Sequence, residues 1–168
     1  MTKDDFYDWL TTVSIPGLFK VYNCHSHMFA YHMQDYPDEK LRERLERRKG
    51  GTDFIVSCSK FLVHEDTAIQ MVLDCIEENK EEVEKFVQKN GLGEITLVSE
   101  YPYPIGEGYV KNTPRGKKYT MNRLVVVVVK TESNHIPLAV KTAYPDFSYE
   151  QIDDVWDDID SWKDKKKE

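Results

Sequence analysis

The stretch "MNRLVVVVVKTESNHIPLAVKTAYP", residues 121–145, contains the two most strand-like segments of the chain. Its five consecutive valines, 125–129, are typical of a central strand that is buried on both faces. The polar residues 131–135 indicate a turn, and the alternating residues 136–145 indicate a returning strand. The stretch therefore predicts an antiparallel β-hairpin.

The returning strand ends in "KTAYP", which places two polar side chains where the chain must turn. Thr142 and Tyr144 are two residues apart, so they should project from one face, with Lys141 and Ala143 on the other. A threonine hydroxyl can orient a phosphate oxygen, and a tyrosine can donate a hydrogen bond or stack on a base. Taken alone, the two residues are explained more simply as the polar end of a hairpin.

The chain before this hairpin is rich in helical patterns. Apolar residues at spacings of three and four predict helices, with a break at Asn79, at residues 2–12, 37–49, 64–90 and 149–162. Further strands are predicted at 53–63 and 94–101, and prolines and glycines predict a long loop at 102–119. The mixed periodicity of 18–33 favours neither state. Because helices precede strands, we predict an α+β fold with N-terminal helices packed on a C-terminal antiparallel sheet.

The composition suits a single domain with a buried core. The chain has 168 residues, of which 40% are hydrophobic and 32% charged. No run of eighteen apolar residues predicts a membrane segment, and the acidic N-terminal stretch lacks a secretory signal core, so a cytoplasmic protein is expected. The three cysteines show neither CxxC nor zinc spacing, which favours reduced thiols over disulfides.

The formal net charge is −7, and residues 146–168 hold nine acidic and four lysine side chains, a net of −5. An acidic chain lacks the broad basic face of most nucleic-acid-binding proteins but can carry a local patch. The loop "IGEGYVKNTPRGKK" is the best such patch, and its candidate RNA-binding cations are Lys111, Arg115, Lys117 and Lys118. A solvated loop is an equal alternative, and the acidic tail could cover this loop or bind a protein partner.

The segment "HSHMFAYH", which begins at His25, concentrates three histidines. They could ligate a metal, but the chain has no HExxH motif and no paired cysteines, so no metal site is expected. Proton transfer is favoured for His27 and His32, because an imidazole titrates near neutral pH. His25, His64 and His135 are expected to be structural or surface residues.

The charge run "LRERLERR", residues 41–48, is of a kind that usually forms a solvated helix face. Arg44 nevertheless lies between Leu41 and Leu45, so it could border the narrow apolar side of the helix. An arginine held there could form a bidentate contact with a phosphate. The cations that follow are explained by the negative end of the helix dipole: Arg47, Arg48 and Lys49.

The order of these signals is more specific than any one of them. The chain carries, in this order, His27 and His32, "LRERL" at 41–45, "SCSKF" at 57–61, "AI" at 68–69, "IGEG" at 105–108, "LVVVVV" at 124–129 and "TAYP" at 142–145. On these motifs it resembles the RNase A-like toxin domain found at the C-terminal ends of bacterial contact-dependent growth-inhibition effectors. The resemblance spans about residues 25–145 and implies the fold of pancreatic ribonuclease without its disulfides. Residues 146–168 would then be an acidic helix and tail added to a single domain, 1–168.

The resemblance implies roles for individual residues. The family's essential histidine falls on His32, its arginine on Arg44, and the threonine and tyrosine of its closing motif on Thr142 and Tyr144. His27 is the reserve for a second proton transfer. The spacing from His32 to Arg44 is one residue longer than is usual in the family. These side chains are expected to converge on one cleft.

The implied activity is metal-independent cleavage of RNA, with transfer RNA as the family-level expectation. Attack by the ribose 2′-OH would give a 2′,3′-cyclic phosphate, and no cofactor would be needed. A cognate immunity protein is an expected partner, and such a toxin would act in the cytosol of a target cell. The alternative is a catalytically inactive module of the same fold that binds RNA or a protein partner.

Overall fold

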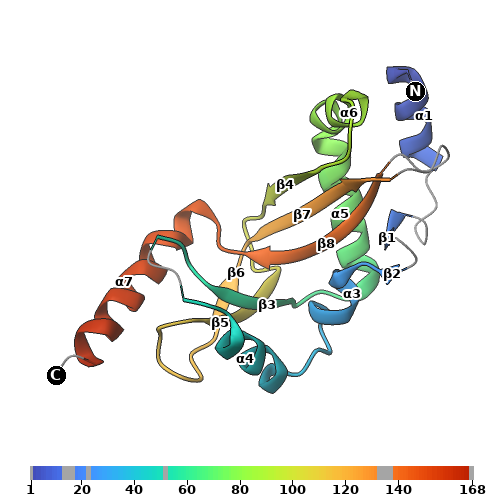
Figure 1. Cartoon of the computed structure of the whole chain (residues 1–168). Helices are drawn as coiled ribbons and strands as arrows, with labels where there is room; N and C mark the ends of the chain where they lie inside the picture. Colours follow the sequence, from blue (N-terminus) through green and yellow to red (C-terminus); the bar gives the residue numbers. More distant parts are fainter. Residues whose placement is uncertain (1, 13–17, 22–23, 51–52, 132–137, 167–168) are drawn as a thin grey trace.

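The computed structural model of the chain describes residues 2–12, 18–21, 24–50, 53–131 and 138–166. Its helices are α1 (Lys3–Thr12), α3 (His27–Tyr31), α4 (Asp38–Arg47), α5 (Glu65–Glu78), α6 (Lys80–Gln88) and α7 (Tyr149–Lys166). Its strands are β1 (Lys20–Val21), β2 (Cys24–His25), β3 (Ser57–Phe61), β4 (Glu94–Glu100), β5 (Gly106–Val110), β6 (Tyr119–Met121), β7 (Arg123–Lys130) and β8 (Leu138–Asp146). These helices and two antiparallel sheets of three strands form the predicted α+β fold (Figure 1).

The sheet β4–β7–β8 is built around the valine strand. Strand β7 pairs antiparallel with β4 on one side and β8 on the other, which confirms the predicted hairpin and central strand. Leu124, Val126 and Val128 are fully buried in the main core, together with side chains of α5. On the opposite face Val125 is buried but Val127 is only half-buried, so the predicted burial on both faces is incomplete.

A β-bulge interrupts the pairing of β7 with β8. The register shifts at Lys141, which has no partner on β7. Val140 and Ala143, three residues apart, are both buried in the core, whereas Lys141 is exposed. The prediction that Lys141 faces the same way as Ala143 is wrong, because a bulge breaks the simple alternation of side chains. The alternation resumes after the bulge, so Thr142 and Tyr144 share the face opposite to Ala143.

The second sheet, β3–β5–β6, lies partly in the segment predicted to be a loop. The prediction of a loop over 102–119 is wrong for β5, whose glycines and neighbouring prolines are ordinarily turn signals. Here the glycines permit close packing. A Cβ at Gly108 would overlap the Cys58 carbonyl oxygen, and one at Gly106 would overlap the Pro145 ring. Strand β5 can therefore lie against both β3 and the end of β8.

The two sheets meet where the end of β8 reaches β3. The Ser59 hydroxyl of β3 donates a hydrogen bond to the Pro145 carbonyl oxygen at 2.7 Å. Helix α4 packs beside this junction, because Leu41 and Leu45 are buried against Val56 at the start of β3. The junction thus brings α4, β3 and the last residues of β8 together.

Helix α7 lies at the end of the molecule opposite to α1 and α6 (Figure 1). Val155 and Ile159 are buried in a small core that includes Phe147 and the second sheet. The helix continues to Lys166, four residues beyond its predicted end at residue 162. Residues 167–168 lie outside the described part of the chain.

The remaining predictions concern the cysteines, a membrane-spanning segment and two short parts of the chain. Cys58 and Cys75 are buried free thiols, as expected for a fold without disulfides. Among the described helices, none is long and apolar enough to cross a bilayer. Residues 13–17, where the first helix was expected to end, and 132–137, with most of the hairpin turn and His135, lie outside the described residues.

Candidate active site

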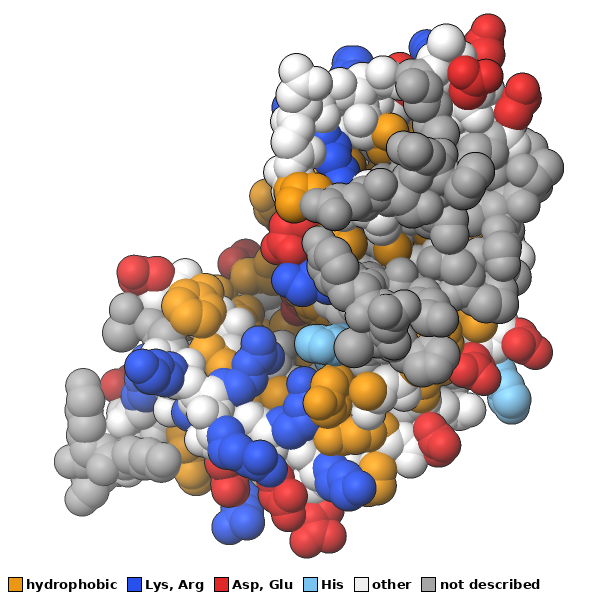
Figure 2. Space-filling model, turned by 45° about the vertical axis from the view of Figure 1, so that its right-hand side comes forward, with side chains coloured by type: hydrophobic (Ala, Val, Ile, Leu, Met, Phe, Trp, Pro, Cys, Tyr) orange, Lys and Arg blue, Asp and Glu red, His pale blue; other side chains and the backbone are white. Residues whose placement is uncertain are grey.

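A cleft of about 930 Å³ opens where α3, α4, β3 and the end of β8 meet. Figure 2 shows Lys and Arg side chains gathered on this face around a hollow, with a histidine at its edge. All five side chains that the sequence predicted to be catalytic line the cleft: His27, His32, Arg44, Thr142 and Tyr144. The structure therefore brings these residues together, as the convergence prediction required.

His32 follows the last residue of α3 and is fixed to the outer edge of β3. Its Nδ1 lies 2.7 Å from the Ser59 carbonyl oxygen, and its own carbonyl accepts a hydrogen bond from the Phe61 N–H at 2.7 Å. Because a carbonyl oxygen only accepts hydrogen bonds, Nδ1 carries the proton of the neutral ring. Nε2 is left with the lone pair, which can accept a proton.

The surroundings keep His32 uncharged at neutral pH. Burial lowers its pKa from 6.5 to about 4, with the Ser59 carbonyl opposing this effect and the positive charges of Arg44 and Arg48 adding to it. The Tyr144 ring lies beside the imidazole, and the two ring centroids are 5.5 Å apart. A neutral imidazole of fixed orientation is the form that a general base requires.

Arg44 is held by aromatic rings and leaves its charge available. Its guanidinium carbon lies 4.3 Å from the ring centroid of Tyr31 and 5.9 Å from that of Tyr36. Its Nη1 donates weakly to the Tyr31 carbonyl oxygen at 3.5 Å. In the described part of the chain, no carboxylate lies within ion-pair distance of this guanidinium. The stacking thus orients a cation that an anion in the cleft can bind.

Thr142 presents a hydroxyl with no hydrogen-bond partner. Its Oγ1 is buried and unpaired within the described structure, although buried polar atoms are rarely left so. The side chain lines the cleft, on the same strand face as Tyr144. An unpaired hydroxyl beside a cationic cleft is suited to donate to an anionic ligand.

Tyr144 and Asp146 follow at the end of β8. Burial raises the pKa of Tyr144, and the nearby Asp146 carboxylate raises it further, so the phenol keeps its proton at neutral pH. Burial also raises the pKa of Asp146, while the Phe147 N–H donates to its Oδ1 at 2.8 Å. Tyr144 is therefore a hydrogen-bond donor in the cleft, whereas Asp146 is an acidic group that the sequence did not indicate.

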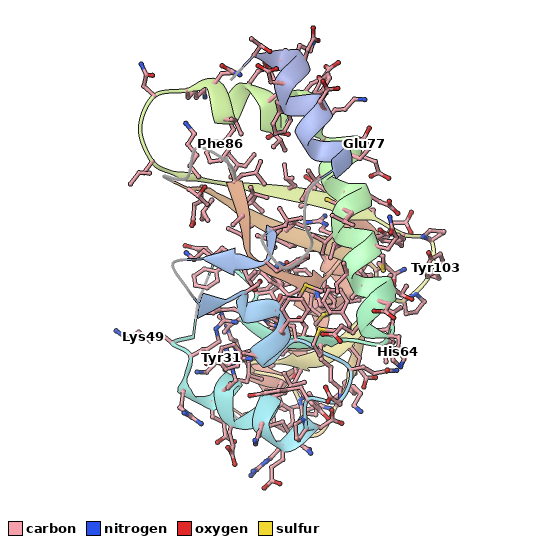
Figure 3. All side chains as sticks on the ribbon, turned by 90° about the vertical axis from the view of Figure 1, so that its right-hand side faces the viewer. Tyr31, Lys49, His64, Glu77, Phe86 and Tyr103 are labelled. Atoms are coloured by element: carbon pink, nitrogen blue, oxygen red, sulfur yellow. The ribbon has the colours of Figure 1, made fainter. Side chains whose placement is uncertain are left out.

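His27 lies at the exposed rim of the cleft. Its ring makes an edge-to-face contact with Tyr31, with centroids 5.6 Å apart. His64, by contrast, is exposed at the start of α5, and Figure 3 shows it on the side of the molecule opposite to Tyr31. The side chain of His25 is outside the described residues. The described histidines of the cleft are thus His27 and His32.

The cleft also contains three cations that were not predicted to be site residues. Arg47, Arg48 and Lys49 line it, and the Arg48 guanidinium donates to the Ser57 carbonyl oxygen. Their run at the end of α4 was explained by the helix dipole, which is a sufficient reason for basic residues at that position. Arg47 and Arg48 follow Arg44 by three and four residues, a spacing that places side chains on the same face of a helix. This spacing could have indicated that they also face the cleft.

The predicted RNA-binding loop lies outside this cleft, and its cations already have partners. Lys111 donates to backbone carbonyls at the C-terminal end of α4. Arg115 lies 3.8 Å from Glu46 and Lys118 lies 2.7 Å from Asp38. The remaining cation of the loop pairs with a carboxylate of α7, through Lys117 and Asp158. The role of this loop in RNA binding stays a prediction, and α7 covers one of its charges.

Metal-ligating side chains are not clustered in the described structure. No group of three or more histidine, cysteine, aspartate or glutamate side chains there could hold a metal ion. The side chains of the cleft include a neutral imidazole, hydroxyl groups and guanidinium groups, beside the Asp146 carboxyl group. This set can accept a proton, donate hydrogen bonds and stabilise negative charge, as acid–base chemistry on a phosphate ester requires.

A family model described as the bacterial CdiA-CT RNAse A domain matches residues 26–145. The chain belongs to this family. A solved structure, the crystal structure of a CdiA-CT/CdiI complex from Y. kristensenii 33638, shares the fold with a TM-score of 0.58 at 15% identity. The match covers 72% of this chain and 99% of that chain. No curated protein matches the chain.

Membership in the CdiA-CT RNase A family confirms the resemblance inferred from the order of the motifs. This is a family of bacterial ribonuclease toxins of contact-dependent growth inhibition. The matched range contains every side chain predicted to be catalytic, from His27 to Tyr144. Helix α7 lies outside that range.

Proposed function

We propose that this CdiA-CT RNase A domain is a toxin-like endoribonuclease that needs no metal and forms a 2′,3′-cyclic phosphate. The observation that carries the proposal is the His32 imidazole. Its Nδ1 is bound to the Ser59 carbonyl, which leaves Nε2 uncharged, and His32 lines the same cleft as Arg44 and as Thr142, whose hydroxyl is unpaired. A base, a cation and a donor on one phosphate are what transesterification of RNA requires.

The proposed reaction begins when His32 Nε2 takes the proton of the ribose 2′-OH. The 2′-oxygen then forms a bond to phosphorus, and the bond from phosphorus to the 5′-oxygen of the next nucleotide breaks. Arg44 and Thr142 bind the non-bridging oxygens, where negative charge increases in the transition state. A proton must reach the leaving 5′-oxygen, and either Tyr144 or His27 is placed in the cleft to donate it.

The direct test is the product formed from RNA by purified protein in EDTA. We expect fragments that end in a 2′,3′-cyclic phosphate, with a 5′-hydroxyl on the following fragment. Intact RNA would favour the alternative of an inactive module that binds RNA or protein. Products with a 5′-phosphate, or cleavage that requires added Mg²⁺, would contradict the proposed chemistry.

The dependence of kcat/KM on pH tests the role of His32 as the base. Only the uncharged ring can accept a proton, so kcat/KM should fall as pH drops through its pKa of about 4, not through 6.5. We expect Arg48→Gln to move this fall to higher pH, because a positive charge that lowers the pKa is removed. Initial rates on a short RNA, measured from acidic to neutral pH, give this dependence for the unaltered protein and for the variant. A fall centred at 6.5 in the unaltered protein would argue against His32 in its observed environment.

The role of the Thr142 hydroxyl can be tested by measuring the stability and the activity of a variant separately. We expect Thr142→Val to keep or raise the free energy of unfolding, by up to about 1 kcal/mol, because an unpaired buried hydroxyl is removed. Cleavage should fall roughly tenfold, because a neutral hydrogen bond to the phosphate is lost. Urea unfolding and cleavage rates on one preparation measure both quantities. Unchanged cleavage would remove Thr142 from the mechanism.

We also propose two partners for this domain. RNA is the substrate, with transfer RNA as the first candidate to assay, and the cytosol of a target cell is the place of action. A cognate immunity protein is the second partner, which is supported by the shared fold with the toxin chain of a CdiA-CT/CdiI complex. Co-expression with genes neighbouring that of the toxin, followed by co-purification, would identify such a protein.

A further inference from the structure

The cleft is larger than the reacting phosphate requires. Its volume of about 930 Å³ is at the upper end of the range for sites that enclose a drug-sized ligand. The proposed reaction uses side chains around His32. The same cleft is also lined by Arg48, Lys49 and Phe54, none of which carries a step of that reaction. These three residues therefore border space for another part of the substrate.

The outer edge of β3 sets the distance between His32 and Arg48. The Ser59 carbonyl contacts His32, and the Ser57 carbonyl accepts a hydrogen bond from Arg48. Carbonyl groups two residues apart on a strand point the same way and are separated by about 6.6 Å. Arg48 is therefore displaced from His32 toward the start of β3, by a distance comparable to one nucleotide step of an extended strand.

The charges at this end of the cleft are available to a ligand. In the described part of the molecule, neither Arg48 nor Lys49 has a carboxylate within ion-pair distance. Lys49 is exposed, and Figure 3 shows it on the same side of the molecule as Tyr31. The predicted basic loop differs in this respect, since Lys118 lies 2.7 Å from Asp38.

An exposed aromatic ring lies at the same end. Phe54 precedes β3 and lines the cleft, and 61% of its surface is accessible to solvent. A ring so exposed at the mouth of a cleft is free to contact a ligand that enters it. Aromatic rings beside cations are the combination with which proteins hold unpaired nucleotides, the ring stacking on the base and the cations binding the backbone.

We propose that Arg48, Lys49 and Phe54 form a second nucleotide subsite next to the one whose phosphate reacts. Arg48 and Lys49 bind the adjacent phosphate, and Phe54 stacks on its base. The nucleotide must be unpaired, because a base inside a duplex does not offer its face to a side chain. The nature of the ligand rests on the proposed function, but binding at this subsite does not depend on cleavage.

Two RNA oligomers with 2′-O-methyl groups, which cannot be cleaved, test the subsite. One is a dinucleotide with a single internal phosphate, and the other is a tetranucleotide with three. We expect the tetranucleotide to bind about tenfold more tightly to the unaltered protein, because it adds a phosphate contact and a stacked base. Titrations followed by NMR chemical shifts measure both dissociation constants, including weak ones.

The decisive variant combines Lys49→Gln with Phe54→Ala. Both side chains are exposed, so the fold should be retained. We expect the tenfold ratio to fall to about twofold and the salt dependence of tetranucleotide binding to weaken by about 0.7 in log–log slope. Lys85→Gln, the same charge removal on the distant helix α6, should leave the ratio unchanged.

Equal affinities of the unaltered protein for the two oligomers would overturn the proposal, as would a ratio that survives in the double variant. A tenfold ratio in a protein that cleaves no RNA would refute the proposed function and support the subsite. Cleavage of RNA without any preference for the longer oligomer would do the reverse. The two hypotheses therefore fail separately.

Discussion

His32→Ala is expected to lower the rate of RNA cleavage by about 10²–10⁴-fold, the largest effect of any single substitution in the cleft. Loss of the imidazole removes the acceptor for the 2′-OH proton, and no other described group in the cleft is a half-buried, uncharged base oriented by a backbone carbonyl. The measurement is the initial rate on a short RNA under single-turnover conditions, with product ends identified.

His64→Ala is the matched control for this substitution. It removes the same side chain from an exposed position at the start of α5, on the far side of the molecule (Figure 3). We expect its cleavage rate to equal that of the unaltered protein. A His32→Ala protein that is folded by circular dichroism yet cleaves at the full rate would end the assignment of His32 as the base.

Arg44→Gln is expected to lower the rate by about 10²–10³-fold, because a cation that stabilises the negatively charged transition state is lost. Its stacking on Tyr31 leaves the guanidinium oriented before substrate binds, so little reorganisation is needed during the reaction. The loss should fall mainly on kcat, since the charge on the phosphate oxygens increases in the transition state.

Arg42→Gln provides the comparison on the same helix. Arg42 stacks on Tyr109 at 5.0 Å and lines a different pocket, so it has the same charge and a similar aromatic contact without access to the cleft. We expect its kcat to change less than threefold. A similar loss in both variants would indicate that the general positive charge of α4, and not the position of Arg44, supports the reaction.

The hairpin and the longer helices could be predicted because their patterns are local, whereas the short helix α3 lies in the segment 18–33 that favoured neither state. The valine run of β7 and the three-four spacing of apolar residues in α5 indicate directly from the sequence which side chains are buried. Strand β5 could not be predicted, since Gly106 and Gly108 are determined by contacts with Pro145 and Cys58, far away in the chain. The bulge at Lys141 could not be predicted for a related reason, because a register shift depends on the partner strand.

The candidate site was predictable only in part. The order of the motifs indicated His32 and Arg44 as site residues. The two-residue spacing of Thr142 and Tyr144 predicted that they share one face of the strand, and the register after the bulge agrees. Neither observation could show that the Thr142 hydroxyl would be left unpaired. The cations beyond Arg44 were missed because one physical explanation, the helix dipole, already accounted for them. The cationic loop was favoured because the sequence does not show which carboxylates lie beside it in space.

The outer edge of β3 has a consequence for solubility. An edge strand with free carbonyl and N–H groups is a template on which another chain can add a strand. Here Arg48 occupies the Ser57 carbonyl, while His32 occupies both the Ser59 carbonyl and the Phe61 N–H. The side chains of Arg48 and His32, which are proposed to bind and cleave RNA, thus also bind two carbonyls of this edge, whereas the Phe61 N–H is bound by the backbone of His32. A substitution of Arg48 or His32 would therefore free a backbone carbonyl on this exposed strand edge, in addition to its effect on the chemistry.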